Sequence, residues 1–297
     1  MSLEIRDPAF ERIVGTSVEL EQLGTGFLFT EGPLWHPRER YLLFSDMPGD
    51  IIRRWSAKGG IQTYRAPSNK ANGLTWDRQG RLLTCEHATS RVTRTEPDGS
   101  ITVLASHRAG KELNSPNDVV VASDGAIYFS DPTYGRMDFY GLERPVPLDF
   151  RGVYRIAPEG GEPQLLVEDF GQPNGLCFSR DETRLYVNDT ERSHIRAFDR
   201  RPDGSLSDAG IWAETSGPGE GAPDGMKIDS EGNLYCAAQG GLHVFAPSGI
   251  CIGVIHVPEV AANFTWGDED LCSVFITAST SLYRMRVKVP GRSPFPD

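Results

Sequence analysis

Six polar side chains that carry an oxygen atom recur along the chain, each at the start of a similar segment. They are Glu31, Asn72, Asn117, Asn174, Asp224 and Asn263. Carboxylate and amide oxygens are hard ligands that suit Ca²⁺ or Mg²⁺ and tolerate Mn²⁺. If the six positions converge, the Glu31 and Asp224 carboxylates repel each other, and a divalent cation is the natural counter-charge. The residue types therefore predict a site for one divalent cation.

The segments that begin with these residues share one order of features: a polar residue, a short apolar run, a turn and a second apolar run. They read EGPLWHPRERYLLFSD, NGLTWDRQGRLLTCEH, NDVVVASDGAIYFSD, NGLCFSRDETRLYVND, DGMKIDSEGNLYCAAQ and NFTWGDEDLCSVFIT. The turns are rich in Asp, Gly and Ser, so each segment is expected to open with a β-hairpin. Asn-Gly and Asp-Gly pairs are also common turn formers, which is the alternative explanation of the first residues.

Further alternating runs after most hairpins supply a third and a fourth strand, and four antiparallel strands make one propeller blade. The fold class predicted is all-β, a six-bladed β-propeller in one domain spanning residues 1–297. The sixth segment ends near Lys288 and leaves too little chain for a fourth strand. The alternating run at residues 18–23 is expected to fill that place and close the ring.

A second polar set follows one hairpin after the first, where each chain should return to the same mouth of the channel. It contains Asp46, His87, Asp131, Asp189 and Gln239. The near-neutral pKa of a histidine would suit His87 to proton shuttling or to a hydrogen bond with substrate, and a structural role is the alternative. Asp118 could orient Asn117 or bond to backbone.

The segment at residues 131–151, DPTYGRMDFYGLERPVPLDFR, is long for a connection inside a compact domain. It begins at the expected mouth and carries several aromatic and arginine residues. We interpret it as a lid over the substrate. The residues expected to contact substrate are Asn72, His87, Asn117, Asp131 and Tyr134.

Composition limits the partners and the location. The formal net charge is −11, so the protein's field repels phosphate backbones and anionic lipid, and neither nucleic acid nor a membrane is an expected partner. The five cysteines form no C-x-x-C pair, and no stretch approaches 18 consecutive apolar residues. The N-terminal segment has no apolar signal core, so a cytoplasmic protein is expected, with a periplasmic one as the alternative. The sequence does not predict the oligomeric state.

Four motifs also carry a family resemblance: EGPLWHP, SPNDVVVASDGAIYFSDPTYG, QPNGLCFS and APDGMKIDSEGNLY. In this order and spacing they resemble the SMP-30/gluconolactonase/LRE family, and the FSDPTYG run is similar to its bacterial gluconolactonase branch. The resemblance implies a six-bladed propeller that hydrolyses a sugar lactone, a small-molecule substrate. It implies Glu31, Asn117, Asn174 and Asp224 as ligands of one divalent cation, with Asp224 also the general base.

The cation first expected is Ca²⁺, with Mg²⁺, Mn²⁺ or Zn²⁺ as alternatives. Animal members of the family carry an Arg two residues before the Asn that corresponds to Asn117, where this chain has Ser115, so their recognition of sugar hydroxyls does not transfer directly. The chain contains neither a G-x-S-x-G elbow nor an H-E-x-x-H pair, which disfavours α/β-hydrolase and zincin chemistry. The alternatives to a lactonase are a metal-dependent phosphotriesterase or arylesterase of the same propeller type, and a non-catalytic cation-binding propeller.

Overall fold

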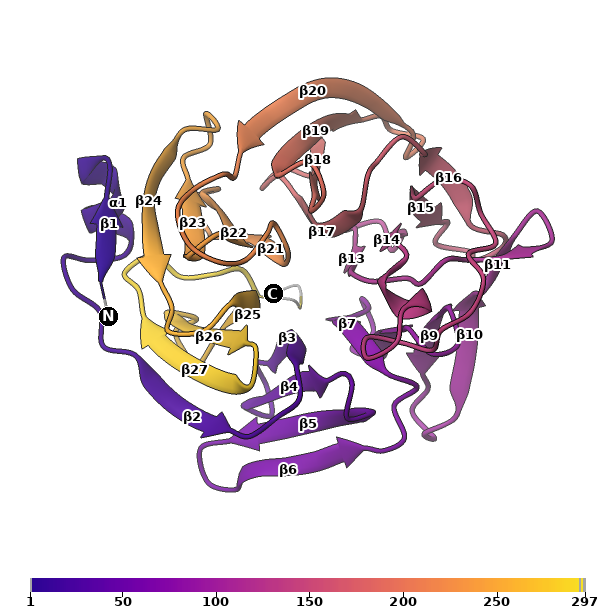
Figure 1. Cartoon of the computed structure of the whole chain (residues 1–297), viewed down its shortest axis with the longest axis horizontal. Helices are drawn as coiled ribbons and strands as arrows, with labels where there is room; N and C mark the ends of the chain where they lie inside the picture. Colours follow the sequence, from indigo (N-terminus) through magenta and orange to yellow (C-terminus); the bar gives the residue numbers. More distant parts are fainter. Residues whose placement is uncertain (1, 294, 296–297) are drawn as a thin grey trace.

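Six antiparallel sheets surround a central channel in the computed structural model, which describes residues 2–293 and 295 (Figure 1). The innermost strands of neighbouring sheets contact one another in succession, and the sixth contacts the first. The predicted six-bladed β-propeller is therefore confirmed.

The first three blades, written from the innermost strand outward, follow the chain order. Blade 1 contains β3 (Thr30–His36), β4 (Tyr41–Asp46), β5 (Ile51–Ser56) and β6 (Gly60–Arg65). Blade 2 contains β7 (Ala71–Trp76), β8 (Leu82–Glu86), β9 (Arg91–Thr95) and β10 (Ile101–Ala105). A small hairpin of β11 (His107–Arg108) and β12 (Lys111–Glu112) follows, and blade 3 contains β13 (Val119–Val121), β14 (Ile127–Asp131), β15 (Gly152–Ile156) and β16 (Gln164–Val167).

The last three blades continue the same pattern. Blade 4 contains β17 (Pro173–Phe178), β18 (Arg184–Asp189), β19 (His194–Arg200) and β20 (Leu206–Glu214). Blade 5 contains β21 (Met226–Ile228), β22 (Leu234–Ala238), β23 (Gly241–Phe245) and β24 (Cys251–His256). Blade 6 contains β25 (Ala261–Gly267), β26 (Ser273–Ala278) and β27 (Ser281–Arg286).

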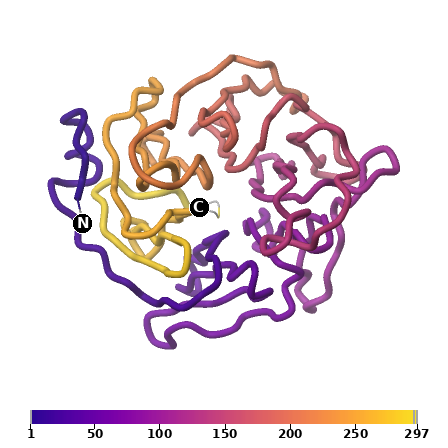
Figure 2. Tube along the Cα trace, in the orientation of Figure 1, coloured from indigo at the N-terminus to yellow at the C-terminus, as the bar shows by residue number. Residues whose placement is uncertain are grey.

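The N-terminal segment closes the ring. Strand β2 (Glu21–Thr25) pairs antiparallel with β27 and completes blade 6, which confirms the predicted closure with slightly later bounds. Before it, β1 (Leu3–Ile5) adds a fifth strand to blade 5, and α1 (Pro8–Ile13) packs there through Phe10. Figure 2 shows this segment passing outside blades 5 and 6 before the chain enters blade 1. The sequence did not predict β1, because three residues are too few to show an alternating pattern.

The second strands of the blades are covered on both faces by neighbouring blades. All residues of β4, β8, β14, β22 and β26 are buried, so these strands have nearly continuous apolar runs in place of alternation. Aromatic side chains fill the wedges between blades, as where Trp35 stacks on Phe275 with ring centroids 5.4 Å apart. This packing fixes the inner strands, and hence the residues at the channel. Among the described residues, no helix combines the length and the hydrophobicity needed to cross a membrane.

Candidate functional site

A cavity occupies one end of the central channel, and the first polar residues of five blades line it. They are Glu31, Asn72, Asn117, Asn174 and Asp224. The sixth, Asn263, lies behind them and donates from Nδ2 to Glu31 Oε2 at 3.2 Å. The structure therefore brings together the six polar residues that begin the repeats.

The glycine that follows most of these residues is explained by the channel. A Cβ atom on Gly32 would lie 2.0 Å from the carbonyl oxygen of Asn72 in the next blade, and one on Gly175 would lie 2.1 Å from that of Asp224. Gly73 is constrained in the same way by Asn117. These glycines allow the inner strands to approach closely enough for the polar side chains to converge. The Asn-Gly and Asp-Gly pairs are therefore not the hairpin turns that composition alone suggests.

Glu31 and Asp224 are the acidic groups of the cavity. Glu31 is buried, and its Oε2 accepts from the backbone N–H of Gly32 at 2.7 Å. Burial raises the pKa of Glu31 to about 7. Burial, followed by the charges of Glu31 and Asp118, raises the pKa of Asp224 well above its ordinary value. The charge of Glu31 thus opposes ionisation of Asp224, and a cation between the two groups would relieve this repulsion.

Beneath this pair lie two charged residues with no predicted ligand role. Asp118 is buried, and its two oxygens accept from the backbone N–H groups of Val119 at 2.9 Å and Leu176 at 3.3 Å. The Lys227 ammonium donates to Asn263 Oδ1 at 2.9 Å, and burial lowers its pKa. Sequence reasoning missed Lys227. A lysine inside an innermost strand could have been noticed, because buried ammonium groups need partners.

These groups leave an excess of negative charge in the channel. The carboxyl groups of Glu31, Asp118 and Asp224 face one ammonium group, that of Lys227, so their fully ionised forms carry about two negative charges more than the positive charge present. A single divalent cation matches this excess.

Amide groups complete a donor set for a hard cation. Asn174 donates from Nδ2 to Thr190 Oγ1 at 3.2 Å, which leaves its carbonyl oxygen free to face the cavity. Within residues 2–293 and 295, the side-chain amide of Asn117 has no hydrogen-bonding partner, whereas its backbone N–H donates to Ser130 O at 2.9 Å. In the same part of the chain, no three His, Cys, Asp or Glu side chains form a metal-binding group. A cation here would therefore need amide oxygens beside the two carboxylates, a combination that suits Ca²⁺, Mg²⁺ or Mn²⁺.

Asn263 has a different role from the one that the sequence predicted. Its Oδ1 accepts from Lys227 Nζ and from the backbone N–H of Phe264 at 2.9 Å, so its nitrogen is directed at Glu31. It is a hydrogen-bond donor that holds Glu31, whereas the sequence suggested a sixth oxygen at the channel axis.

The acidic members of the second polar set bond to backbone. Asp131 is fully buried outside the cavity lining and accepts from the N–H groups of Asn114 at 2.9 Å and Ser115 at 2.7 Å. Asp46 and Asp189 likewise accept from the segments that enter their own blades. Each carboxylate fixes the chain just before an innermost strand.

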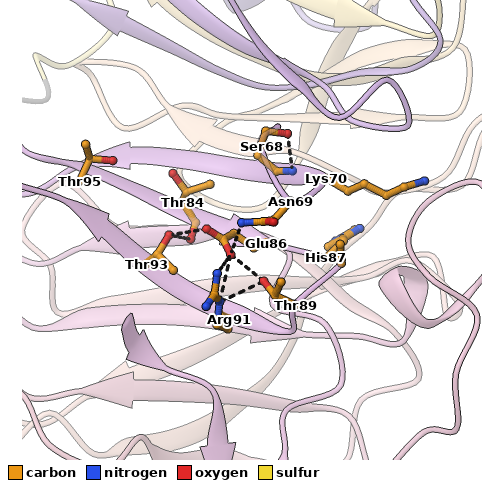
Figure 3. Close-up of polar contacts among 12 residues, drawn as sticks. Ser68, Asn69, Lys70, Thr84, Glu86, His87, Thr89, Arg91, Thr93 and Thr95 are labelled. Carbon is orange, nitrogen blue, oxygen red and sulfur yellow. Dashed lines mark hydrogen bonds and ion pairs between the residues drawn. The ribbon is translucent and has the colours of Figure 1, made fainter. Parts of the chain in front are cut away.

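In blade 2 the residue at this position is Glu86, and His87 comes one residue later. Figure 3 shows the Glu86 carboxylate at the centre of a network with Asn69, Thr89, Arg91 and Thr93. The His87 side chain therefore lines the cavity, and only the backbone N–H of this residue bonds to the entering segment, donating to Lys70 O at 3.2 Å. This shift by one residue separates His87 from the other members of the second set.

Replacing Asp131 by Ala should destabilise the fold. Two buried N–H groups would lose their acceptor, and each such loss costs about 1–3 kcal/mol, so we expect the free energy of unfolding to fall by about 2–6 kcal/mol. Urea unfolding of the variant measures this, with Asp138→Ala in an exposed part of the same segment as control. A loss of catalysis without a loss of stability would instead place Asp131 in the chemistry.

The segment at residues 131–151 forms one wall of the cavity through Tyr134 and Tyr140. It contains one turn of 3₁₀ helix, η1 (Tyr134–Arg136), and its start is held by Ser115, whose Oγ donates to Pro132 O at 2.6 Å and accepts from Gly135 N at 2.9 Å. A Cβ atom on Gly135 would lie 2.6 Å from that of Ser115. The close contact explains why a small residue occupies position 115, since a long side chain would displace this wall.

The far part of the same wall is bound to blade 2 and reaches blade 1. Arg144 donates to the carbonyl oxygen of His87 at 3.1 Å and to Ser90 Oγ at 2.6 Å, and Lys70 Nζ donates to Phe139 O at 3.0 Å. The Tyr140 ring meets Phe29 edge to face, with centroids 5.5 Å apart. The wall therefore spans the rim of the cavity from blade 3 to the entry of blade 1.

The chain is similar to known proteins along most of its length. Residues 29–280 match the family model described as the SMP-30/Gluconolactonase/LRE-like region. A gluconolactonase of Zymomonas mobilis is 31% identical over 96% of this chain and 85% of its own, and a pentonolactonase of Haloferax volcanii is 28% identical over 96% of each. The solved structure of a gluconolactonase from Xanthomonas campestris has a TM-score of 0.89 and 36% identity, covering 97% of this chain and 95% of that one. The similarity includes every segment that contributes to the cavity.

Proposed function

Because this chain belongs to the SMP-30/gluconolactonase/LRE-like family, we propose that it is an enzyme that hydrolyses the ester bond of a sugar lactone in the cavity at the end of the channel. Relatives that match nearly the whole chain are a gluconolactonase and a pentonolactonase, both lactone hydrolases. The observation that carries the proposal is the convergence of Glu31, Asn117, Asn174 and Asp224, with an excess of negative charge, on a cavity open to a small molecule.

In this proposal Glu31, Asn117, Asn174 and Asp224 hold one divalent cation through their oxygens. The donor set and the charge balance of the channel support a doubly charged ion. When bound, such a cation supplies a Lewis acid that polarises the lactone carbonyl and increases the acidity of water. Asn263 and the backbone of Gly32 keep the Glu31 carboxylate in place.

Asp224 is the proposed general base. Its carboxylate accepts the proton of the attacking water, and its environment supports the role because burial and neighbouring carboxylates raise its pKa and hence its proton affinity. The products are the hydroxy acid and the proton that it releases. Asn72, Asn117 and Tyr134 also line the cavity. In this proposal their side chains form hydrogen bonds with the hydroxyl groups of the lactone.

Cation affinity should increase with pH between about 6 and 8. Without the cation, burial raises the pKa of Glu31 to about 7 and raises that of Asp224 also, so both carboxyl groups hold protons that binding must displace. Below these pKa values the affinity should fall by up to about tenfold per pH unit for each proton displaced. Calorimetric titration with Ca²⁺ in buffers of different ionisation enthalpy measures the protons released at pH 7, and we expect at least about half a proton. A dissociation constant that is constant from pH 6 to 8 would contradict this.

A panel of sugar lactones, assayed after chelation and again after Ca²⁺, Mg²⁺, Mn²⁺ or Zn²⁺ is restored, tests the proposed function. We expect acid release that depends on the added cation, and little turnover of aryl esters or phosphotriesters. Full lactone hydrolysis in the chelated protein would refute the cation's role. Tight cation binding without cleavage of any lactone would instead indicate a binding protein.

A further inference from the structure

His87 connects the wall at residues 131–151 to an amide in the cavity. Its ring is fully buried. Nδ1 lies 3.0 Å from the carbonyl oxygen of Tyr140, and Nε2 lies 3.2 Å from Asn72 Nδ2. Figure 3 shows the His87 side chain apart from the neighbouring Glu86 network. Both ring nitrogens are therefore engaged by the wall and by the cavity residue.

These two contacts determine the tautomer of the ring. A backbone carbonyl can only accept, so Nδ1 carries the proton. Burial lowers the pKa of His87 to about 4, so at neutral pH the ring is uncharged and Nε2 is an acceptor. The group facing Nε2 must then be the amide nitrogen of Asn72, which directs the carbonyl oxygen of Asn72 elsewhere in the cavity that this residue lines.

The wall at residues 131–151 bonds to the backbone of His87 as well as to its ring. Arg144 donates to the carbonyl oxygens of His87 and Ala88, and a Cβ atom on Gly135 would lie 2.8 Å from the Cβ atom of His87. The wall backbone thus lies directly against the histidine. The rigid His87 ring therefore links the backbone of Tyr140 to the side-chain amide of Asn72.

We infer that His87 is a positioning residue, which uses the wall at residues 131–151 to fix the Asn72 amide so that its carbonyl oxygen accepts a hydrogen bond from a hydroxyl group of the lactone. The inference rests on the proposed lactonase function. It makes Asn72 the group that contacts substrate, and His87 the group that keeps the acceptor in place. His87 itself neither shuttles a proton nor touches the substrate.

A double-mutant cycle tests the inference. Asn72→Ala should lower kcat/KM for the best lactone by about 10- to 100-fold, and His87→Leu by about tenfold, the effects expected for one hydrogen bond to substrate. The double variant should be no slower than Asn72→Ala, because His87 acts only through Asn72. His87→Gln, which offers one acceptor and one donor, should recover most of the loss. Losses that multiply in the double variant would overturn the inference.

Two further measurements separate positioning from folding and from the proposed function. His243→Leu is the matched control, because His243 is also buried and bonds a backbone carbonyl but does not line the cavity, so its kcat/KM should be unchanged. Calcium affinity should be unchanged in His87→Leu. Nitrogen NMR of the imidazole rings at pH 7, assigned with that variant, should show Nδ1 protonated and Nε2 unprotonated, whether or not the protein cleaves lactones. Protonation at Nε2 would overturn the inference, whereas a correct tautomer in an inactive wild type would refute only the function.

Discussion

The Asp224→Asn variant should lose about 10²- to 10⁴-fold in kcat for lactone hydrolysis, the range that a positioned general base contributes. The amide cannot accept the proton of the attacking water, although its oxygen can still bind a cation. Calcium affinity should fall as well, because one of the two carboxylates of the donor set is lost, but enough should remain for the site to be saturated with cation. Steady-state kinetics at saturating cation, combined with calorimetric titration of the same variant, measures the two effects separately.

Asp203→Asn is a suitable control for this comparison, since Asp203 lies in an exposed turn and bonds to Ser205. It should behave as the wild type in both measurements. If Asp224→Asn retained full kcat, Asp224 would not be the base. If activity were lost at low cation and excess cation restored the wild-type kcat, Asp224 would be a ligand only.

Replacing Glu31 by Gln should have opposite effects on cation binding and on the stability of the cation-free protein. The change removes one of two carboxylates from the donor set, so we expect Ca²⁺ affinity to fall by at least about 100-fold and activity at ordinary cation concentrations to be lost. Without cation, the variant should unfold at the same temperature as the wild type or higher, because a buried carboxyl beside Asp224 is replaced by a neutral amide.

Thermal unfolding with and without Ca²⁺ measures this reversal. A Ca²⁺ concentration just sufficient to saturate the wild type should raise the unfolding temperature of the wild type. It should leave that of Glu31→Gln nearly unchanged, since a ligand stabilises only a protein that binds it at the concentration used. Glu182→Gln, in the turn between β17 and β18 and away from the cavity lining, is the control and should respond to Ca²⁺ as the wild type does. A Glu31→Gln protein that is strongly destabilised without cation would show that Glu31 supports the fold and not the ion.

Much of the fold could be predicted because a repeated pattern constrains it strongly. The six polar residues that begin the repeats, and the alternating run near the N-terminus, were sufficient for the ring and its closure. The convergence of Glu31, Asn174 and Asp224 followed from the same repeat, since equivalent positions of a propeller meet at one end of the channel. The convergence of these positions, though not the role of each side chain, could therefore be predicted before any contact was known.

The remaining features depend on contacts between segments that are distant in sequence. The offset of His87 from Asp46 and Asp131 comes from Glu86, which takes the place that binds the entering segment. Lys227 becomes important only because the inner segments of blades 1 and 3 bring the carboxylates of Glu31 and Asp118 near it. The spacing of residues along the chain does not indicate which of them become neighbours in three dimensions.

The contacts of the wall at residues 131–151 could not be predicted from the sequence either. Its length suggested a lid, but the sequence does not indicate that Ser115 and Arg144 bind it to blades 3 and 2. The close approach of Gly135 to Ser115 likewise becomes visible only in three dimensions. The small side chain at position 115 and the wall above it are therefore one feature of the site, although they lie apart in the chain.

Anomalous diffraction from a crystal soaked in Mn²⁺ tests the central claim most directly. We expect one strong peak at the end of the channel, about 2.0–2.6 Å from oxygen atoms of Glu31, Asn174 and Asp224, which is the range of hard-cation coordination. A saturated crystal with no peak between these three residues, or with its peak elsewhere, would contradict the account.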